Sequence, residues 1–204
     1  MDVLENTMIN DIISASLQKS ISYQDYRALV EQLTAENTTT GPEKTEVLAN
    51  YTALNDRRMH RWDKTVKVSD EAKFKIENSL KKMTWLVLTE SWCGDAAHIM
   101  PVINKLAELN KNIDYKVVLR DENEALMNEF LTNGAKAIPK LIMINNETGE
   151  VENTFGPRPS VATNMVNDYK EKHGKLTPEF KEDLQRWYNK DKGQTVIADL
   201  VELI

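Results

Sequence analysis

Cys93 is the residue whose type and position could do chemistry, and it is the only cysteine in the chain. It follows an apolar run, Trp85 to Leu88, and precedes apolar residues spaced three and four apart. The first pattern is typical of a buried strand and the second of an amphipathic helix. At such a junction the unpaired N–H groups and the helix dipole favour a thiolate, which makes Cys93 a candidate nucleophile. The alternative interpretation is a small buried hydrophobic side chain.

The residues around Cys93 resemble the active site of the thioredoxin superfamily. That site reads Trp-Cys-Gly-Pro-Cys at a strand-to-helix turn, with a helix proline eight residues after the first cysteine. Trp92, Cys93, Gly94 and Pro101 match this pattern. The resemblance implies a thioredoxin fold, an α/β structure in which helices flank a mixed central sheet.

A second signature of the superfamily is an Ile-Pro or Val-Pro pair that opens the next strand. In the superfamily this proline is cis and lies against the cysteine. Ile138-Pro139, followed by the run from Lys140 to Ile144, matches it. The resemblance extends over residues 80 to 173. The sequences of the motifs are similar to those of a bacterial branch of thioredoxin-like proteins. We therefore predict a cis bond at Ile138-Pro139 that faces Cys93.

The departures from the superfamily pattern restrict the chemistry. Ala96 stands where the second, resolving cysteine should be, so an internal disulfide and a dithiol cycle are excluded. Val87 replaces the buried acid that serves the resolving thiol in thioredoxins. Asp95 replaces the motif proline, and a carboxylate near the sulfur should raise the thiol pKa. Asp95 is alternatively an acid that stabilises the first turn of the helix.

The resemblance implies that three loops meet at the cysteine and form a substrate groove beside it. Arg158 lies in the third loop, between two prolines that restrict its backbone. Its charge could offset Asp95 and stabilise the thiolate, or bind an anionic substrate end, or simply be exposed. We predict that Arg158 outweighs Asp95. The predicted groove consists of Trp92, Gly94, Asp95, Ile138, Pro139 and Arg158 around the catalytic Cys93.

Composition excludes several other classes of function. A net charge of -6 and a pI near 5.2 argue against a nucleic-acid partner. No run approaches the ~20 apolar residues that span a bilayer, so we expect no membrane partner. One cysteine and three scattered histidines offer no metal-ligand spacing. The segment Met1–Glu5 has no features of a secretory signal, which predicts a cytoplasmic location.

We expect a helical N-terminal extension over residues 1–80, a thioredoxin-like domain over 81–175 and C-terminal helices over 176–204, both additions packed on the core. The core should contain strands over 85–90, 114–119, 140–145 and 151–155. The usual first strand is not obvious, and Lys64 to Val68 is the candidate for it. A third helix over 43–63 should begin near Pro42, and a fourth should carry Leu80 and Met83.

Two further groups of residues have competing interpretations. Arg57, Arg58, His60 and Arg61 form a basic cluster on the third predicted helix. Such a cluster is usually a solvated face, and the alternative is a site for an anion or a partner. His98 lies on the second turn after Cys93, and we do not expect it to be aimed at the sulfur.

Our first functional hypothesis is a monothiol oxidoreductase, in which Cys93 attacks a protein or small-molecule disulfide. No cofactor is required, and glutathione or another small thiol would be the co-substrate that replaces the missing cysteine. The alternative is a binding or adaptor module that retains the groove without the redox cycle. A third hypothesis is a glutathione-dependent iron–sulfur carrier. The sequence leaves the oligomeric state open.

Overall fold

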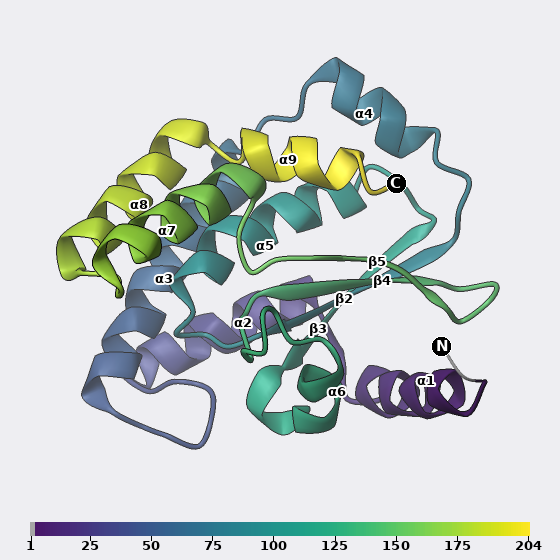
Figure 1. Ribbon diagram of the computed structural model, residues 1–204, viewed down its shortest axis with the longest axis horizontal. Coiled ribbons are helices and arrows are strands. Elements are labelled where there is room, and N and C mark those ends of the chain that lie inside the picture. The colour runs from purple at the N-terminus through teal and green to yellow at the C-terminus, as the bar shows by residue number, and fades with distance from the viewer. Residues whose placement is uncertain (1–2) are drawn as a thin grey trace.

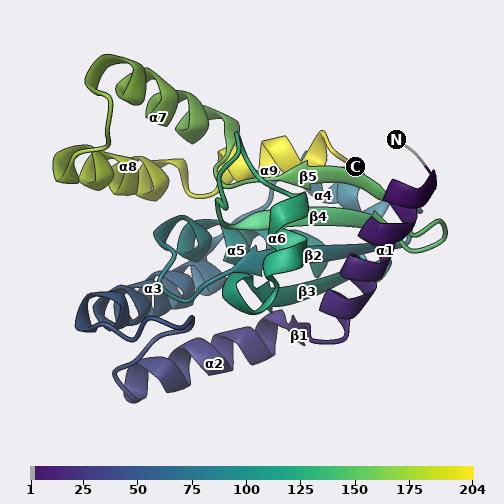
Figure 2. The ribbon, with the colours of Figure 1, turned by 60° about the horizontal axis from the view of Figure 1, so that its bottom comes forward.

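The computed structural model describes residues 3–204, with side chains from Thr7 onward, and shows a five-stranded sheet with helices on both faces (Figures 1 and 2). The spatial order of the strands is β1-β3-β2-β4-β5. The predicted α/β architecture, a mixed sheet flanked by helices, is confirmed. Residues 1 and 2 of the predicted N-terminal extension lie outside the described residues.

β2 (Met83–Thr89) is the central strand, and all of its residues are buried. It pairs in parallel with β3 (Ile113–Leu119) and antiparallel with β4 (Lys140–Asn145). β5 (Val151–Phe155) continues the sheet antiparallel to β4. A strand that is covered on both faces needs an apolar run instead of an alternating pattern, and β2 has such a run. All four strands predicted for this part of the chain are present.

β1 (Ile21–Ser22) lies at the sheet edge beside β3, and the prediction that Lys64 to Val68 supplies a strand is wrong. Residues up to Thr65 instead form the end of α3 (Glu46–Thr65). β1 pairs antiparallel with β3 through Ile21 and Ser22 alone. A pairing this short has no alternating apolar pattern, which is why the sequence does not indicate a strand at Ile21 and Ser22.

α1 (Val3–Leu17) and α2 (Tyr23–Ala35) form the first part of the chain. α2 is capped by Ser22, whose Oγ accepts a hydrogen bond from the Asp25 N–H at 3.0 Å. α3 begins later than predicted, because the hydroxyl of Thr45 caps it. Pro42 therefore lies in the preceding loop and not in the first turn of the helix.

α4 (Asp70–Glu77) is capped by Ser69 and is shorter than predicted. The prediction that Leu80 and Met83 lie on this helix is wrong. Met83 opens β2 instead, and its N–H donates to the carbonyl oxygen of Asn112 at 2.8 Å. The spacing of Met83 fits the apolar stripe of the helix as well, but Met83 belongs to the sheet.

The remaining helices follow the central strand. They are α5 (Gly94–Ala107), the 3-10 helix η1 (Arg120–Glu122), α6 (Glu124–Glu129), α7 (Ser160–His173), α8 (Pro178–Asp191) and α9 (Gln194–Val201). α5 and α9 lie on one face of the sheet, and α1 and α6 lie on the other (Figures 1 and 2). Buried side chains from the sheet, α2, α3, α5, α8 and α9 form one hydrophobic core. Within residues 3–204, no helix has the length and apolar character needed to cross a membrane.

Candidate active site around Cys93

Cys93 lies at the junction of β2 and α5, as predicted, and immediately precedes the first turn of α5. We call residues 90–95 the motif turn. Cys93 is only 8% exposed, and its Sγ donates a hydrogen bond to the carbonyl oxygen of Ile138 at 3.3 Å. The Ile138–Pro139 peptide bond is cis, which is the geometry that the resemblance implies. The fold therefore brings together two segments that lie 45 residues apart in the sequence.

Buried polar side chains from the N-terminal part of the chain hold the motif turn in place. Ser91 Oγ accepts a hydrogen bond from Thr40 N at 3.0 Å, and Ser91 N donates to Thr40 Oγ1 at 2.9 Å. Asn55 of α3 donates to the Ser91 carbonyl oxygen at 2.9 Å. The hydroxyls of Thr39 and Thr52 lie 3.0 and 2.9 Å from Ser91 Oγ. Sequence reasoning missed this cluster, because a loop hydroxyl carries no signal of the distant backbone that it bonds.

Asp95 and Arg158 form an ion pair in which Nη2 lies 2.7 Å from Oδ2. Tyr188 of α8 donates to the other carboxylate oxygen at 2.9 Å. Burial raises the pKa of the Asp95 carboxyl, and the neighbouring Arg158 and Tyr188 oppose that rise. Arg158 is three-quarters buried and is bound to Asp95, so the interpretation of Arg158 as an exposed arginine is wrong.

Gly156 allows the loop of residues 156–159, which carries Arg158, to reach the site. Its φ is +112°, and a Cβ at this position would lie 2.1 Å from the carbonyl oxygen of Pro139. Only glycine tolerates both conditions, so the loop packs directly on the cis-proline. At the other end of the loop, the Ser160 N–H and hydroxyl donate to Asp199 of α9 at 2.6 and 2.8 Å. These two anchors place Arg158 beside the motif turn.

Burial raises the pKa of the Cys93 thiol to about 12, and the Asp95 carboxylate adds to the rise. The N–H groups of Ala96 and Asp95 at the start of α5 lower the pKa, and Arg158 lowers it least. The prediction that Arg158 outweighs Asp95 is therefore wrong, because the guanidinium is already paired with that carboxylate. Desolvation also outweighs the helix N-terminus, so the resting thiol is protonated at neutral pH.

His98 connects helices behind the motif turn, and it forms no hydrogen bond to the sulfur among the described residues. Its Nδ1 accepts a hydrogen bond from Trp62 Nε1 at 2.9 Å, so Nε2 carries the proton and donates to Gln185 Oε1 at 2.6 Å. The ring stacks on Tyr188 with centroids 4.4 Å apart. Burial lowers the pKa of His98 to about 4. The neutral imidazole thereby positions Tyr188, which bonds Asp95.

Arg58 of α3 lies beside Gly94 of the motif turn. A Cβ at Gly94 would lie 3.5 Å from Arg58 Nη1, which donates to Asn55 Oδ1 at 3.0 Å. Burial and the nearby Arg61 lower the pKa of Arg58. Sequence analysis placed Arg58 in a basic cluster but not at this site. Helical spacing indicates which residues share a face, but it does not indicate what packs against that face.

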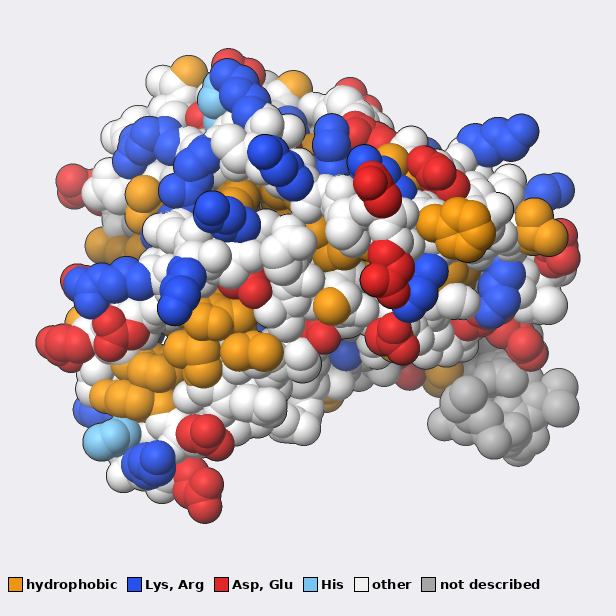
Figure 3. Space-filling model, turned by 90° about the horizontal axis from the view of Figure 1, so that it is seen from above, with side chains coloured by type: hydrophobic (Ala, Val, Ile, Leu, Met, Phe, Trp, Pro, Cys, Tyr) orange, Lys and Arg blue, Asp and Glu red, His pale blue; other side chains and the backbone are white. Residues whose placement is uncertain are grey.

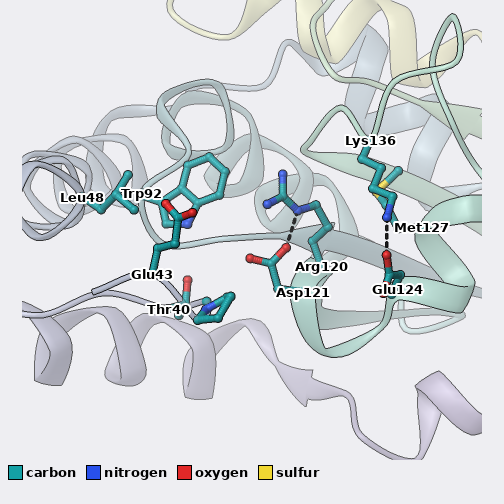
Figure 4. Close-up of a pocket in the computed structure, with 11 residues that line it drawn as sticks. Thr40, Glu43, Leu48, Trp92, Arg120, Asp121, Glu124, Met127 and Lys136 are labelled. Atoms are coloured by element: carbon teal, nitrogen blue, oxygen red, sulfur yellow. Dashed lines mark hydrogen bonds and ion pairs between the residues drawn. The ribbon is translucent and has the colours of Figure 1, made fainter. Parts of the chain in front are cut away.

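Trp92 lines a pocket of about 470 Å³ at the motif turn (Figure 4). The guanidinium carbon of Arg120 lies 5.0 Å from the indole centroid, and Arg120 Nε lies 2.7 Å from Asp121 Oδ1. Lys136 and Glu124 form an ion pair at the end of the pocket opposite Trp92. Of the predicted groove residues, Trp92 alone lines this pocket, and its other walls include charged residues from η1, α6 and the following loop.

Comparisons with known proteins agree with the fold. A family model described as Thioredoxin matches residues 41–170. The crystal structure of a protein of unknown function from Pseudomonas aeruginosa has a TM-score of 0.59 at 16% identity, covering 74% of this chain and 84% of that chain. An HIV epitope scaffold has a TM-score of 0.55 at 14% identity, covering 90% of this chain and 97% of that chain. These likenesses show the fold alone. A search of curated proteins finds no significant match.

Proposed function

We propose that this chain, which belongs to the thioredoxin family, exchanges disulfides through Cys93 as a single thiol. Membership of the family indicates a redox or thiol-related role. The observation that supports the finer proposal is the position of the sulfur, 3.3 Å from the Ile138 carbonyl oxygen beside the cis-proline. A cysteine that only filled the core would not need to lie at a helix N-terminus against this strand-opening loop.

In the first step, Cys93 loses its proton and the thiolate attacks one sulfur of a substrate disulfide R–S–S–R′. A bond forms between Cys93 Sγ and the R sulfur, the S–S bond breaks, and R′S⁻ leaves and takes up a proton. The N–H groups of Asp95 and Ala96 stabilise the negative sulfur. The Ile138 carbonyl oxygen, which accepts the resting S–H, can also accept an N–H from an extended substrate.

The second step needs a thiol from outside the chain, because Ala96 replaces the resolving cysteine. The thiolate of glutathione or another small thiol attacks the R sulfur of the mixed disulfide. Cys93 leaves as a thiolate and recovers a proton, and R remains in a disulfide with the external thiol. A second molecule of external thiol then reduces that disulfide to free R–SH.

The test is reduction of a glutathionylated peptide by glutathione, with wild type compared with Cys93→Ser. We expect wild type to accelerate the reaction, and the variant, which keeps a polar atom of similar size, to have no effect. Mass spectrometry of wild type quenched by acid should detect a mixed disulfide on Cys93. Equal rates for the two proteins, with no adduct on wild type, would exclude the proposal.

A binding module without exchange is the second candidate. The observation that favours it is burial of the thiol, which raises the Cys93 pKa to about 12 and disfavours the thiolate. In this case Cys93→Ser should bind an extended, reduced peptide as tightly as wild type, while the exchange assay shows no difference. Titration of a fluorescent peptide with both proteins separates the two candidates.

A further inference from the structure

A second pocket lies between the C-terminal end of α3 and the turn that joins α8 to α9. Its volume is about 680 Å³, which is in the size range of small-molecule sites. Arg61, Lys67 and Lys192 line it, and no aspartate or glutamate of the described residues does. In the view of Figure 3, lysine and arginine side chains are spread over both halves of the face, among aspartate and glutamate side chains. We call this site the anion pocket.

The three cations of the anion pocket are exposed, and none forms an ion pair with a described residue. Acids nearby in the sequence are bound elsewhere: Asp70 pairs with Lys73, and Asp191 accepts hydrogen bonds from Thr195. In a chain with a net charge of -6, three uncompensated cations around one hollow form a local positive field.

The walls of the anion pocket are tied together by hydrogen bonds. Gln194 Nε2 donates to the carbonyl oxygens of Lys67 and Lys192 at 3.0 and 3.4 Å, which links the two lysine-bearing segments. Arg61 lies over the Trp62 ring, 4.5 Å from its centroid, and donates to Asn189 Oδ1 at 2.5 Å. The contacts with Trp62 and Asn189 hold Arg61 in place. Because a guanidinium has five N–H donors, Arg61 still has donors for a ligand.

We infer that the anion pocket binds a small organic anion that carries phosphate groups or several carboxylates. Arg61 supplies planar, directed donors, and Lys67 and Lys192 supply mobile point charges, which together suit an anion of more than one negative charge. The hydroxyl of Ser69 adds a neutral polar group to the lining. None of these residues takes part in the proposed exchange at Cys93, so the inference does not depend on the proposed function.

The experiment is calorimetric titration at low salt with pyrophosphate, citrate and orthophosphate. The test variant is Lys67→Gln/Lys192→Gln, and the matched control is Lys64→Gln/Lys190→Gln. The control removes two exposed lysines from the same part of the molecule, neither of which lines the pocket, and changes the net charge equally. We expect wild type to bind a multivalent anion, the test variant to bind about tenfold more weakly, and the control to stay within about twofold.

The three probes identify the source of the anion. Tighter binding of pyrophosphate than of citrate assigns the pocket to a phosphate-bearing molecule, and the reverse order assigns it to a polycarboxylate. Both orders support the inference. Absence of binding to wild type by all three probes overturns it. Equal weakening in the two double variants also overturns it, because diffuse surface charge and not the pocket would then attract the anion. Circular dichroism melting checks that both variants are folded.

Discussion

The Asp95 carboxylate of the motif turn is paired, whereas the cations of the anion pocket have no such partner among the described residues. At the motif turn, the Asp95 side chain is only 11% exposed and is held by Arg158 and Tyr188. In the anion pocket, Lys67 and Lys192 are exposed and form no ion pair with a described residue. A buried charge is stable only with partners, and an exposed charge remains available to solvent or a ligand. The charges at Cys93 therefore maintain the architecture of the site, whereas those of the pocket can recruit a molecule.

The strongest test of this contrast is the pH dependence of Cys93 alkylation. Raising the pH from 7 to 10 should increase the rate about a thousandfold, because the thiolate fraction rises tenfold per unit below a pKa of about 12. Cys93 is the only cysteine, so the rate of iodoacetamide labelling followed by mass spectrometry reports this thiol alone. Free glutathione in the same buffers is the control for the reagent. A plateau near the ordinary thiol pKa would show that the sulfur is solvated, and the contrast between the regions would disappear.

The pH dependence of stability tests the buried polar contacts behind the turn. His98 has a folded-state pKa of about 4, so the unfolded chain binds a proton there at a higher pH than the folded chain does. Stability should therefore fall as the pH decreases from about 6.5 to about 4, by about 3 kcal/mol from this residue. Urea unfolding should be measured at both ends of this pH range. The free energy of unfolding of His98→Gln should fall by about 3 kcal/mol less than that of wild type. An equal loss in the two proteins would contradict the neutral, buried imidazole.

Removing the carboxylate tests whether the charges at the turn are structural. Asp95→Ala should lower the free energy of unfolding by about 2 kcal/mol, because Arg158 and Tyr188 lose a buried partner. The matched control is Asp183→Ala, which breaks an exposed ion pair on α8. The control should change the free energy by less than about 0.5 kcal/mol in the same urea titration. Similar losses for the two variants would mean that the Asp95 pair is no more structural than a surface pair.

The smallest expected effect concerns the balance of charges at the sulfur. Arg158→Ala should raise the Cys93 pKa and slow alkylation at pH 8 about threefold, whereas Asp95→Asn should lower the pKa and accelerate alkylation by a larger factor. Arg158→Lys keeps the positive charge and is the control. If Arg158→Ala has the larger effect, Arg158 outweighs Asp95 in solution, as the sequence analysis predicted.

The core strands and the position of Cys93 could be predicted because both leave local patterns. A buried run followed by helical spacing defines the strand-to-helix junction without reference to the rest of the chain. The approach of Pro139 to Cys93 required the family resemblance, because nothing in the intervening residues encodes it. The cap of α2 was predictable for a local reason as well, since Ser22 and Asp25 lie three residues apart.

The rest of the site depends on which distant segments meet, and a single sequence does not contain this information. Arg58 and the hydroxyl cluster reach the motif turn through the packing of α3 and its preceding loop. The thiol pKa was mispredicted for the same reason. The effect of a helix N-terminus is local, but desolvation of Cys93 depends on distant segments such as the loop at Ile138, on which Gly156 packs through Pro139.

Several contacts that hold the motif turn come from parts of the chain outside residues 81–175. A gene fragment limited to residues 81–175 would keep Cys93, Pro139 and Arg158, but it would discard every hydroxyl that bonds Ser91 and the tyrosine that bonds Asp95. Such a fragment would leave Ser91 and Asp95 without these partners, so the surroundings of Cys93 depend on helices on both sides of the core.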